Sequence, residues 1–249
     1  MFTRKMLLGL VATAAVAAIS MAASANSVSF TSVAGSNSDG PLSATITFKA
    51  IAGGIDITVV NNETGTIAKG QSVSALSFGI SGISLPTGFT EMKGETYDPS
   101  SGTSWTLASG TSFDTTGSSP INHWGFGVSG STVTLATAGS GAPGGNPHYL
   151  ILGSTGTAGS GSSLANSNFY PYVIGPADFI LTDSSITAGT VLLTSNFTGL
   201  TVGFGTGPDT TLNTNPNGSV IPLPEAFWSG ISLLGALGIG ASLRKKLAH

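Results

Sequence analysis

ATITFKAIAGGIDITVVNN, residues 44–62, is the stretch that decides the fold class. Apolar residues alternate with Thr and Lys over residues 44–50, and with Asp and Thr over residues 55–59. This period of two is typical of strands that bury one face. A turn at Gly53-Gly54 separates the two runs, and Asn61-Asn62 closes the second. The stretch therefore predicts a β-hairpin.

Short alternating runs of the same kind recur along the chain, separated by Gly, Ser, Asn or Pro clusters. Between the two terminal segments no run has the 3.6-residue period of an amphipathic helix. We therefore expect an all-β domain over residues 26–204, an antiparallel β-sandwich or jelly roll. The further runs are residues 76–80, 105–107, 124–128, 133–135, 179–181, 191–193 and 200–204.

Four segments depart from this alternation. Residues 149–153 and 170–174 are continuously apolar, which predicts strands or extended segments covered on both faces. Residues 154–163 contain mainly Gly, Ser, Thr and Ala and predict a flexible surface loop. Residues 205–221, rich in Gly, Pro, Thr and Asn, predict a stalk that links the domain to the C-terminal segment.

The composition narrows the class of protein. Charged residues make up only 8% of the chain, and Gly occurs 36 times, so solubility depends on Ser, Thr and Asn. Residues 26–220 contain three lysines and ten acidic residues, which gives a net charge of −7. This acidic interior argues against binding to nucleic acid or to an anionic lipid surface. The absence of cysteine excludes disulfides, thiolate metal sites and cysteine nucleophiles.

The N-terminal segment, residues 1–25, has the layout of a signal peptide. Arg4 and Lys5 are followed by an apolar stretch over residues 6–19, and then by Ala23-Ser24-Ala25. Small residues at Ala23 and Ala25 fit signal peptidase, with cleavage after Ala25. An uncleaved membrane anchor is the alternative, but the apolar stretch is short for a span.

The C-terminal segment, residues 222–249, has three parts. An uncharged apolar run from Ala226 to Leu243 would be about 27 Å long as a helix, close to the thickness of a bilayer core. A buried amphipathic helix is the alternative, but glycines leave this run without an ionic face. We expect a transmembrane helix over residues 226–243 and a cytoplasmic basic tail over residues 244–249. The basic cluster is Arg244, Lys245 and Lys246.

A proline and glutamate motif precedes the apolar run. It consists of Pro222, Leu223, Pro224 and Glu225. Together with the span and the basic cluster it resembles the PEP-CTERM sorting signal of bacteria that make exopolysaccharide. The motif departs from the common Val-Pro-Glu-Pro form and is closer to the Val-Pro-Leu-Pro-Ala variant. The resemblance implies handling by an exosortase, an integral-membrane sorting enzyme that acts near the motif.

Motifs for chemistry are few. Residues 125–130 and 139–144 match G-x-G-x-x-G, but the nucleotide-binding motif must open a helix, and neither match does so. His123 and His148 are the histidines of the expected mature domain, and no G-x-S-x-G nucleophile motif accompanies them. Asp98 lies in a turn-like stretch that could bind calcium weakly. We expect no catalytic residue, no cofactor and no metal site.

Aromatic residues offer one binding hypothesis. Stacked on a sugar, they would suit a module that binds exopolysaccharide, whereas aromatics in alternating register more often belong to a core. The candidates are Trp105, Trp124, Tyr149, Tyr170 and Tyr172.

The sequence as a whole predicts a non-enzymatic exported protein of the cell surface or extracellular matrix. It would be anchored in the inner membrane at least transiently, with signal peptidase and an exosortase as processing enzymes and exopolysaccharide as a further partner. Two alternatives stay open: a carbohydrate-binding module for the organism's own exopolysaccharide, and a secreted hydrolase that uses His123 or His148.

Overall fold

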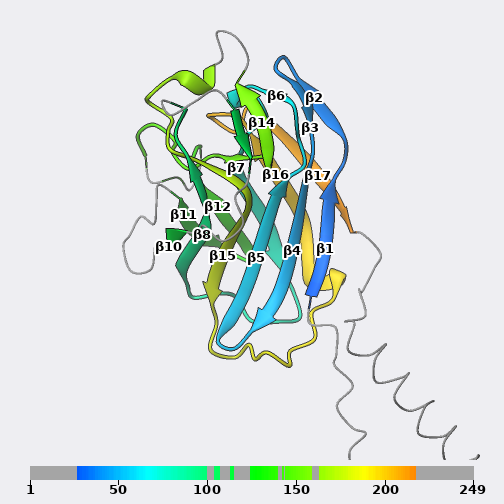
Figure 1. Ribbon diagram of the computed structural model, residues 1–249. Coiled ribbons are helices and arrows are strands. Elements are labelled where there is room, and N and C mark those ends of the chain that lie inside the picture. The colour runs from blue at the N-terminus through cyan, green and yellow to red at the C-terminus, as the bar shows by residue number, and fades with distance from the viewer. Residues whose placement is uncertain are drawn as a thin grey trace, which may run out of the picture. The chain divides into compact units, whose positions relative to one another are not determined.

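Strands dominate the computed structural model, which describes residues 27–99, 104–106, 113–114, 124–139, 142, 144–158 and 163–216 (Figure 1). The largest sheet has 12 strands, and two smaller sheets have three and two. Helical structure among the described residues is limited to Pro99 and to the short 3-10 turns η1 (Lys69–Gln71), η3 (Ser163–Ala165) and η4 (Thr194–Asn196). The all-β prediction is confirmed.

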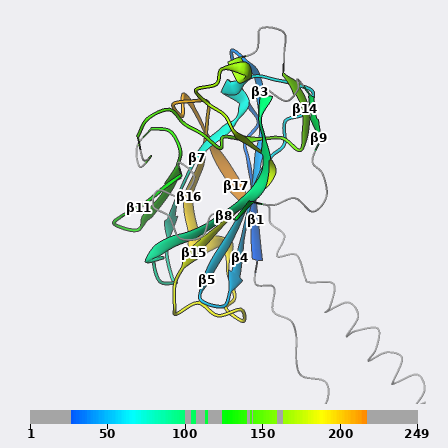
Figure 2. The same cartoon turned by 60° about the vertical axis from the view of Figure 1, so that its left-hand side comes forward.

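The strands of the largest sheet come from the whole length of the domain. They are β1 (Ser27–Ser32), β4 (Ala44–Ile51), β5 (Gly54–Asn61), β7 (Val73–Ile80), β8 (Gly88–Tyr97), β10 (Phe113–Asp114), β11 (Gly125–Ser129), β12 (Thr132–Ala136), β13 (Ile151–Leu152), β15 (Tyr172–Thr182), β16 (Phe197–Phe204) and β17 (Thr210–Pro216). The three-stranded sheet contains β6 (Thr66–Ile67), β14 (Thr155–Ala158) and β9 (Ser104–Thr106), of which β9 and β14 are seen side by side in Figure 2. The two-stranded sheet is the hairpin of β2 (Gly35–Asn37) and β3 (Gly40–Leu42).

The largest sheet closes on itself. Its order is β10-β8-β15-β5-β4-β1-β17-β16-β7-β12-β11. The short strand β13 pairs in parallel with β15 and antiparallel with β7. These two pairings complete a barrel-like ring that runs from β15 through β5, β4, β1, β17, β16 and β7 to β13. The apolar segment at residues 149–153 therefore contains a strand buried on both faces, as its sequence predicts.

The predicted hairpin is present as β4 and β5, with its turn one residue earlier than expected. Ile51 pairs with Gly54, so Ala52 and Gly53 form the turn. Gly53 has φ 84, a conformation that glycine adopts without strain. A Cβ on Gly54 would lie 2.0 Å from the carbonyl oxygen of Leu181. Gly54 thus allows β15 to approach β5.

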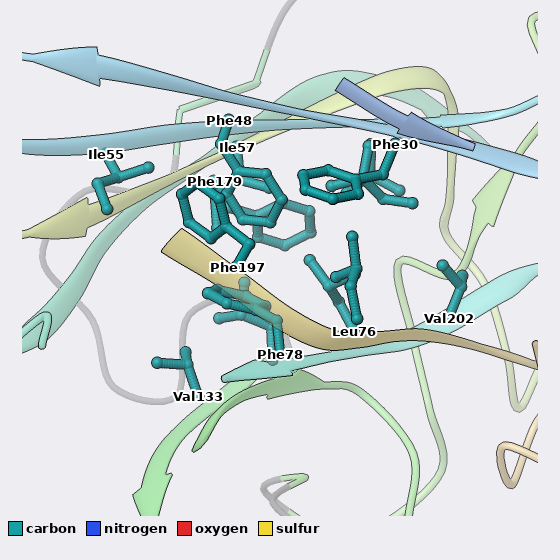
Figure 3. Close-up of a cluster of buried hydrophobic side chains, with 14 of the residues drawn as sticks. Phe30, Phe48, Ile55, Ile57, Leu76, Phe78, Val133, Phe179, Phe197 and Val202 are labelled. Atoms are coloured by element: carbon teal, nitrogen blue, oxygen red, sulfur yellow. The ribbon is translucent and has the colours of Figure 1, made fainter. Parts of the chain in front are cut away.

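The main core fills the ring (Figure 3). The rings of Phe48 on β4 and Phe197 on β16 stack with their centroids 3.9 Å apart. Phe30 and Phe78 meet Phe48 edge-on at 5.8 and 4.9 Å. Each such side chain contributes about 1.5–3 kcal/mol when fully buried. The apolar residues that alternate in the sequence therefore form the packed interior.

The predicted stalk is wrong for most of its length. Thr210–Pro216 forms β17, which pairs with β1 on one side and β16 on the other. Leu212 packs against the core, and the other described side chains of β17 are Thr and Asn, so the segment lacks an apolar alternation. Its backbone nevertheless pairs with a strand on each side. The folded domain thus extends to residue 216 rather than 204, and residues 217–221 of the predicted stalk lie outside the described residues.

Two shorter predictions are also wrong. The predicted loop at residues 154–163 contains β14, which pairs with β6 and β9. The predicted strand at residues 191–193 is irregular. Asn196 accepts a hydrogen bond from the backbone N–H of Leu193 at 2.7 Å, so the chain turns into η4 instead of joining a ladder. At residues 191–193 the Asn196 amide overrides a weak alternation, whereas β14 is a strand because β6 and β9 pair with it.

The first and last strands of the domain are neighbours. β1 and β17 pair antiparallel, with Phe30 opposite Pro216 (Figure 1, blue and orange). The start of β1 and the end of β17 therefore lie at the same end of the sheet. Any segment before residue 27 and any segment after residue 216 must leave the domain from this end.

Candidate functional site

The predicted processing residues lie outside the described residues. They are Ala23 and Ala25 of the signal cleavage site, Pro222, Leu223, Pro224 and Glu225 of the motif, Ala226 to Leu243 of the span, and Arg244, Lys245 and Lys246 of the basic cluster. The strands begin at Ser27 and end at Pro216, so the described domain stops short of both predicted processing sites.

The structure brings four of the five predicted aromatic residues together with His148. Trp124, His148, Tyr149, Tyr170 and Tyr172 are here called the aromatic cluster. Trp124 and Tyr149 pack with the main core, and Tyr170 and Tyr172 pack with a second buried group. The indole Nε1 of Trp124 donates to the carbonyl oxygen of Tyr149 at 3.0 Å. The backbone N–H of Tyr149 donates to the carbonyl oxygen of Pro171 at 2.7 Å. The fifth aromatic residue, Trp105, belongs to β9 of the three-stranded sheet.

Two members of the aromatic cluster belong to the interior. Trp124 is 1% exposed and its ring lies 4.8 Å from that of Phe179. Tyr172 is fully buried, and its hydroxyl donates to the carbonyl oxygen of Leu164 at 3.3 Å. Burial raises the pKa of the Tyr172 hydroxyl, and the neighbouring Tyr170 and Tyr97 raise it further. Neither ring can stack on a sugar, which corrects the predicted binding surface at these two positions.

The other three members are half-buried. Tyr149 has φ 55, which costs a non-glycine residue about 1 kcal/mol or more. His148 places Nδ1 2.7 Å from the carbonyl oxygen of Tyr170. In a catalytic triad a carboxylate accepts a hydrogen bond from the Nδ1 of the histidine. In this protein a backbone oxygen is the partner of His148 Nδ1. Tyr149 and Tyr170 are the accessible part of the cluster.

The motif at residues 125–130 does not have the geometry of a nucleotide site. Gly125–Ser129 is β11, and a turn at Gly130 leads directly into β12. Phosphate binding by this motif needs the N-terminus of a helix, and a hairpin stands there instead. The second match, residues 139–144, lies partly outside the described residues.

The calcium hypothesis finds no support among the described residues. Asp98 is exposed just after β8. In this part of the chain no group of three or more His, Asp or Glu side chains is close enough to hold a metal ion.

A polar row that the sequence did not reveal crosses the outside of the largest sheet. Ser29, Thr47, Thr58, Asp178 and Lys93, here called the outer row, stand opposite one another on β1, β4, β5, β15 and β8. The hydroxyls of Ser29 and Thr47 are 2.6 Å apart. Thr58 donates to Asp178 at 2.6 Å. The row offers hydroxyl and carboxylate oxygens to solvent on a surface of low charge.

Asp56 lies beside the outer row, and the charge of its carboxylate is poorly compensated. It stands opposite Lys49 on β4, yet its Oδ1 atom is buried without a hydrogen-bond partner. Burial raises the pKa of Asp56, and the charge of Asp178 raises it further, while Lys49 and Lys93 act in the opposite direction. This carboxylate therefore weakens the folded state at neutral pH.

Alternation in the sequence indicated that Thr47 and Thr58 face outward. It could not indicate their neighbours, because Thr58 and Asp178 are 120 positions apart. The outer row depends on the pairing of β5 with β15, which local patterns do not encode.

No family model, no curated protein and no solved structure matches this chain. Within the residues that the structure describes, no helix is long and apolar enough to cross a membrane, and the predicted span at residues 226–243 lies outside them.

Proposed function

We propose that this chain is a non-enzymatic exported protein of the cell surface or extracellular matrix, delivered by a PEP-CTERM and exosortase route in an exopolysaccharide-producing bacterium. One observation supports the proposal above others. The strands start two residues after Ala25 and end six residues before Pro222. Cleavage after Ala25 and near the motif would leave every described strand whole.

In this proposal signal peptidase removes residues 1–25, and Ala226 to Leu243 holds the protein in the inner membrane. Arg244, Lys245 and Lys246 stay on the cytoplasmic side. An exosortase then acts near Pro222 to Glu225 and releases the domain outward. The short segment of residues 217–221, instead of the longer predicted stalk, gives the enzyme access.

We also propose a sandwich-like character for the closed sheet. Phe48 and Phe197 stack across the interior from opposite sides of the ring. Two facing layers of this kind form the core of a β-sandwich. A rigid domain of this shape suits an envelope or matrix component that has no catalytic task.

Mass spectrometry of the mature protein, recovered from outside the producing cells, tests the sorting route. We expect a chain that begins at Asn26 and ends near the motif. The triple variant Pro222→Ala, Pro224→Ala and Glu225→Ala should accumulate as membrane-bound precursor. Asn217→Ala, in the same short segment but outside the motif, is the matched control and should be processed normally. An extracellular chain intact through His249 would overturn the proposal.

Glycan binding is a second candidate because Tyr149 and Tyr170 keep accessible surface beside His148. Retention on the organism's own exopolysaccharide should fall with Tyr149→Ala and with Tyr170→Ala. Trp124→Ala is unsuitable as a probe because it removes a core side chain. Circular dichroism of each tyrosine variant confirms that it is folded. Unchanged retention by two folded variants would exclude this surface.

A further inference from the structure

Three loops gather at the end of the sheet where β1 starts and β17 ends. They are residues 51–54, 81–87 and 183–196, and we call this end the terminal pole. Gly53 donates its backbone N–H to Ile186 at 2.9 Å, and Ser81 donates to Asn196 at 2.9 Å. Phe197, directly after the third loop, has its ring 6.1 Å from that of Phe30 on β1. The loops and the two ends of the domain therefore form one surface (Figure 1).

The three loops of the terminal pole expose almost no charge, and the exposed charge next to them is Lys49 on β4, opposite Ser27. The loops contain one ionisable residue, Asp183, which is 4% exposed. Asp183 accepts hydrogen bonds from the hydroxyls of Ser84 and Ser185 and from the backbone N–H of Ser185. Burial alone would raise the pKa of Asp183, but these hydrogen bonds hold it below its usual value. The charge of Asp183 is thus compensated by hydrogen bonds within the loops.

Aliphatic side chains take the place of charge on this surface. Val191 is 49% exposed and Leu193 is 50% exposed, although both are large hydrophobic residues. They lie on either side of the buried Leu192, on the loop that leads into η4. Water is a poor environment for such a pair, whereas an apolar or interfacial environment is a favourable one.

The opposite end of the domain carries exposed carboxylates, together with Lys69 in η1 and Val33, which is 46% exposed. The loops there contain three exposed acidic residues, Asp39, Asp98 and Asp209. Asp39 lies in the turn between β2 and β3, Asp98 comes directly after β8, and Asp209 comes directly before β17, all at the end remote from Ser27 and Pro216. A membrane surface that contains anionic lipid would repel this end. The exposed acidic residues of the described loops are therefore concentrated at the end remote from Ser27 and Pro216.

The length of chain between β17 and the predicted span indicates what lies against the terminal pole. Residues 217–225, nine in all, separate β17 from the apolar run that begins at Ala226. Nine residues reach at most about 30 Å when fully extended, and about 16 Å as a flexible coil. A span anchored at Ala226 would therefore keep the terminal pole within a short distance of the lipid headgroups.

We propose that the terminal pole is a lipid-facing surface, on which Val191 and Leu193 contact the bilayer interface while the acidic end points away from it. This inference rests on the proposed function, because it requires the C-terminal span. It adds an orientation for the domain and the residues that set this orientation.

Single labelling sites are available because the chain has no cysteine. The full-length protein is reconstituted in phosphatidylcholine vesicles that contain a nitroxide-labelled lipid. An environment-sensitive fluorophore is attached at Ser195→Cys on the terminal pole, at Ser38→Cys on the opposite end, or at Gly235→Cys in the predicted span. Ser195 and Ser38 are both exposed, so they form a matched pair.

We expect quenching at position 195 to exceed that at position 38 several-fold. Adding Val191→Ser and Leu193→Ser to the Ser195→Cys protein should reduce quenching toward the value at position 38. Strong quenching at position 235 with equal, weak quenching at positions 195 and 38 would overturn the orientation and leave the anchor intact. Absence of quenching at position 235 would overturn the anchor and the orientation with it. A blue-shifted but unquenched label at position 195 would indicate protein contact, which contradicts a lipid-facing surface.

Discussion

The inner and outer faces of β4 and β5 are formed by adjacent residues, yet different interactions stabilise them. Phe48 and Ile57 point inward and are fully buried, whereas Thr47 and Thr58 point outward and are half-buried. The inner face packs ring against ring. The outer face joins hydroxyls and carboxylates across strands. The difference indicates that the inner face supplies most of the stability.

The largest expected effect tests this division directly. Phe48→Ala removes a ring that contacts Phe30, Phe78 and Phe197. It should lower the free energy of unfolding by about 3–5 kcal/mol. Thr47→Ala, one position away on the outer face, is the matched control and should cost about 1 kcal/mol. Urea unfolding measures both, and similar losses in the two variants would contradict the division.

The inner face could be predicted from the sequence because it depends on local alternation. Residues 44–50 and 55–59 show which side chains are buried without reference to the rest of the chain. The hairpin follows from the glycines between them. The same reasoning located β7, β12 and β16, whose apolar residues also alternate.

The outer row and β17 could not be predicted because both depend on distant partners. β17 is mainly Thr and Asn, and it is a strand because β1 and β16 stand on its two sides. Asp178 becomes part of a row only when β15 pairs with β5 and β8. The apolar run at residues 170–174 did indicate that Tyr172 is covered, but the sequence could not show that Tyr149 and Tyr170 keep accessible surface. These outcomes follow from the closure of the ring at β13.

A smaller effect is expected within the outer row. Thr58→Val keeps the shape of the side chain but removes the hydroxyl that donates to Asp178 at 2.6 Å. The cost should be about 1 kcal/mol, because water can replace the lost donor at a half-buried carboxylate. A double-mutant cycle with Asp178→Ala isolates the pair. A coupling energy near zero would show that this hydrogen bond does not stabilise the outer face.

The smallest expected effect has the opposite sign, and it concerns Asp56. Because burial and then Asp178 raise the pKa of Asp56, the folded state binds the proton more tightly than the unfolded chain does. The stability that this protonation contributes is present at acid pH and is lost as the pH rises through the folded pKa. Asp56→Asn should therefore stabilise the protein at pH 7, by less than about 1 kcal/mol at this partly exposed site.

Urea unfolding at acid and neutral pH measures this change, and the difference between Asp56→Asn and the wild type should shrink at acid pH, where Asp56 is protonated. Lys49→Met is the matched test, because it removes a charge that lowers the pKa of Asp56. It should increase the gain from Asp56→Asn. If Asp56→Asn instead lowers stability at pH 7, the attraction between Lys49 and Asp56 outweighs the cost of burial. The outer face would then contribute to folding through its charges, and the contrast with the inner face would be one of degree.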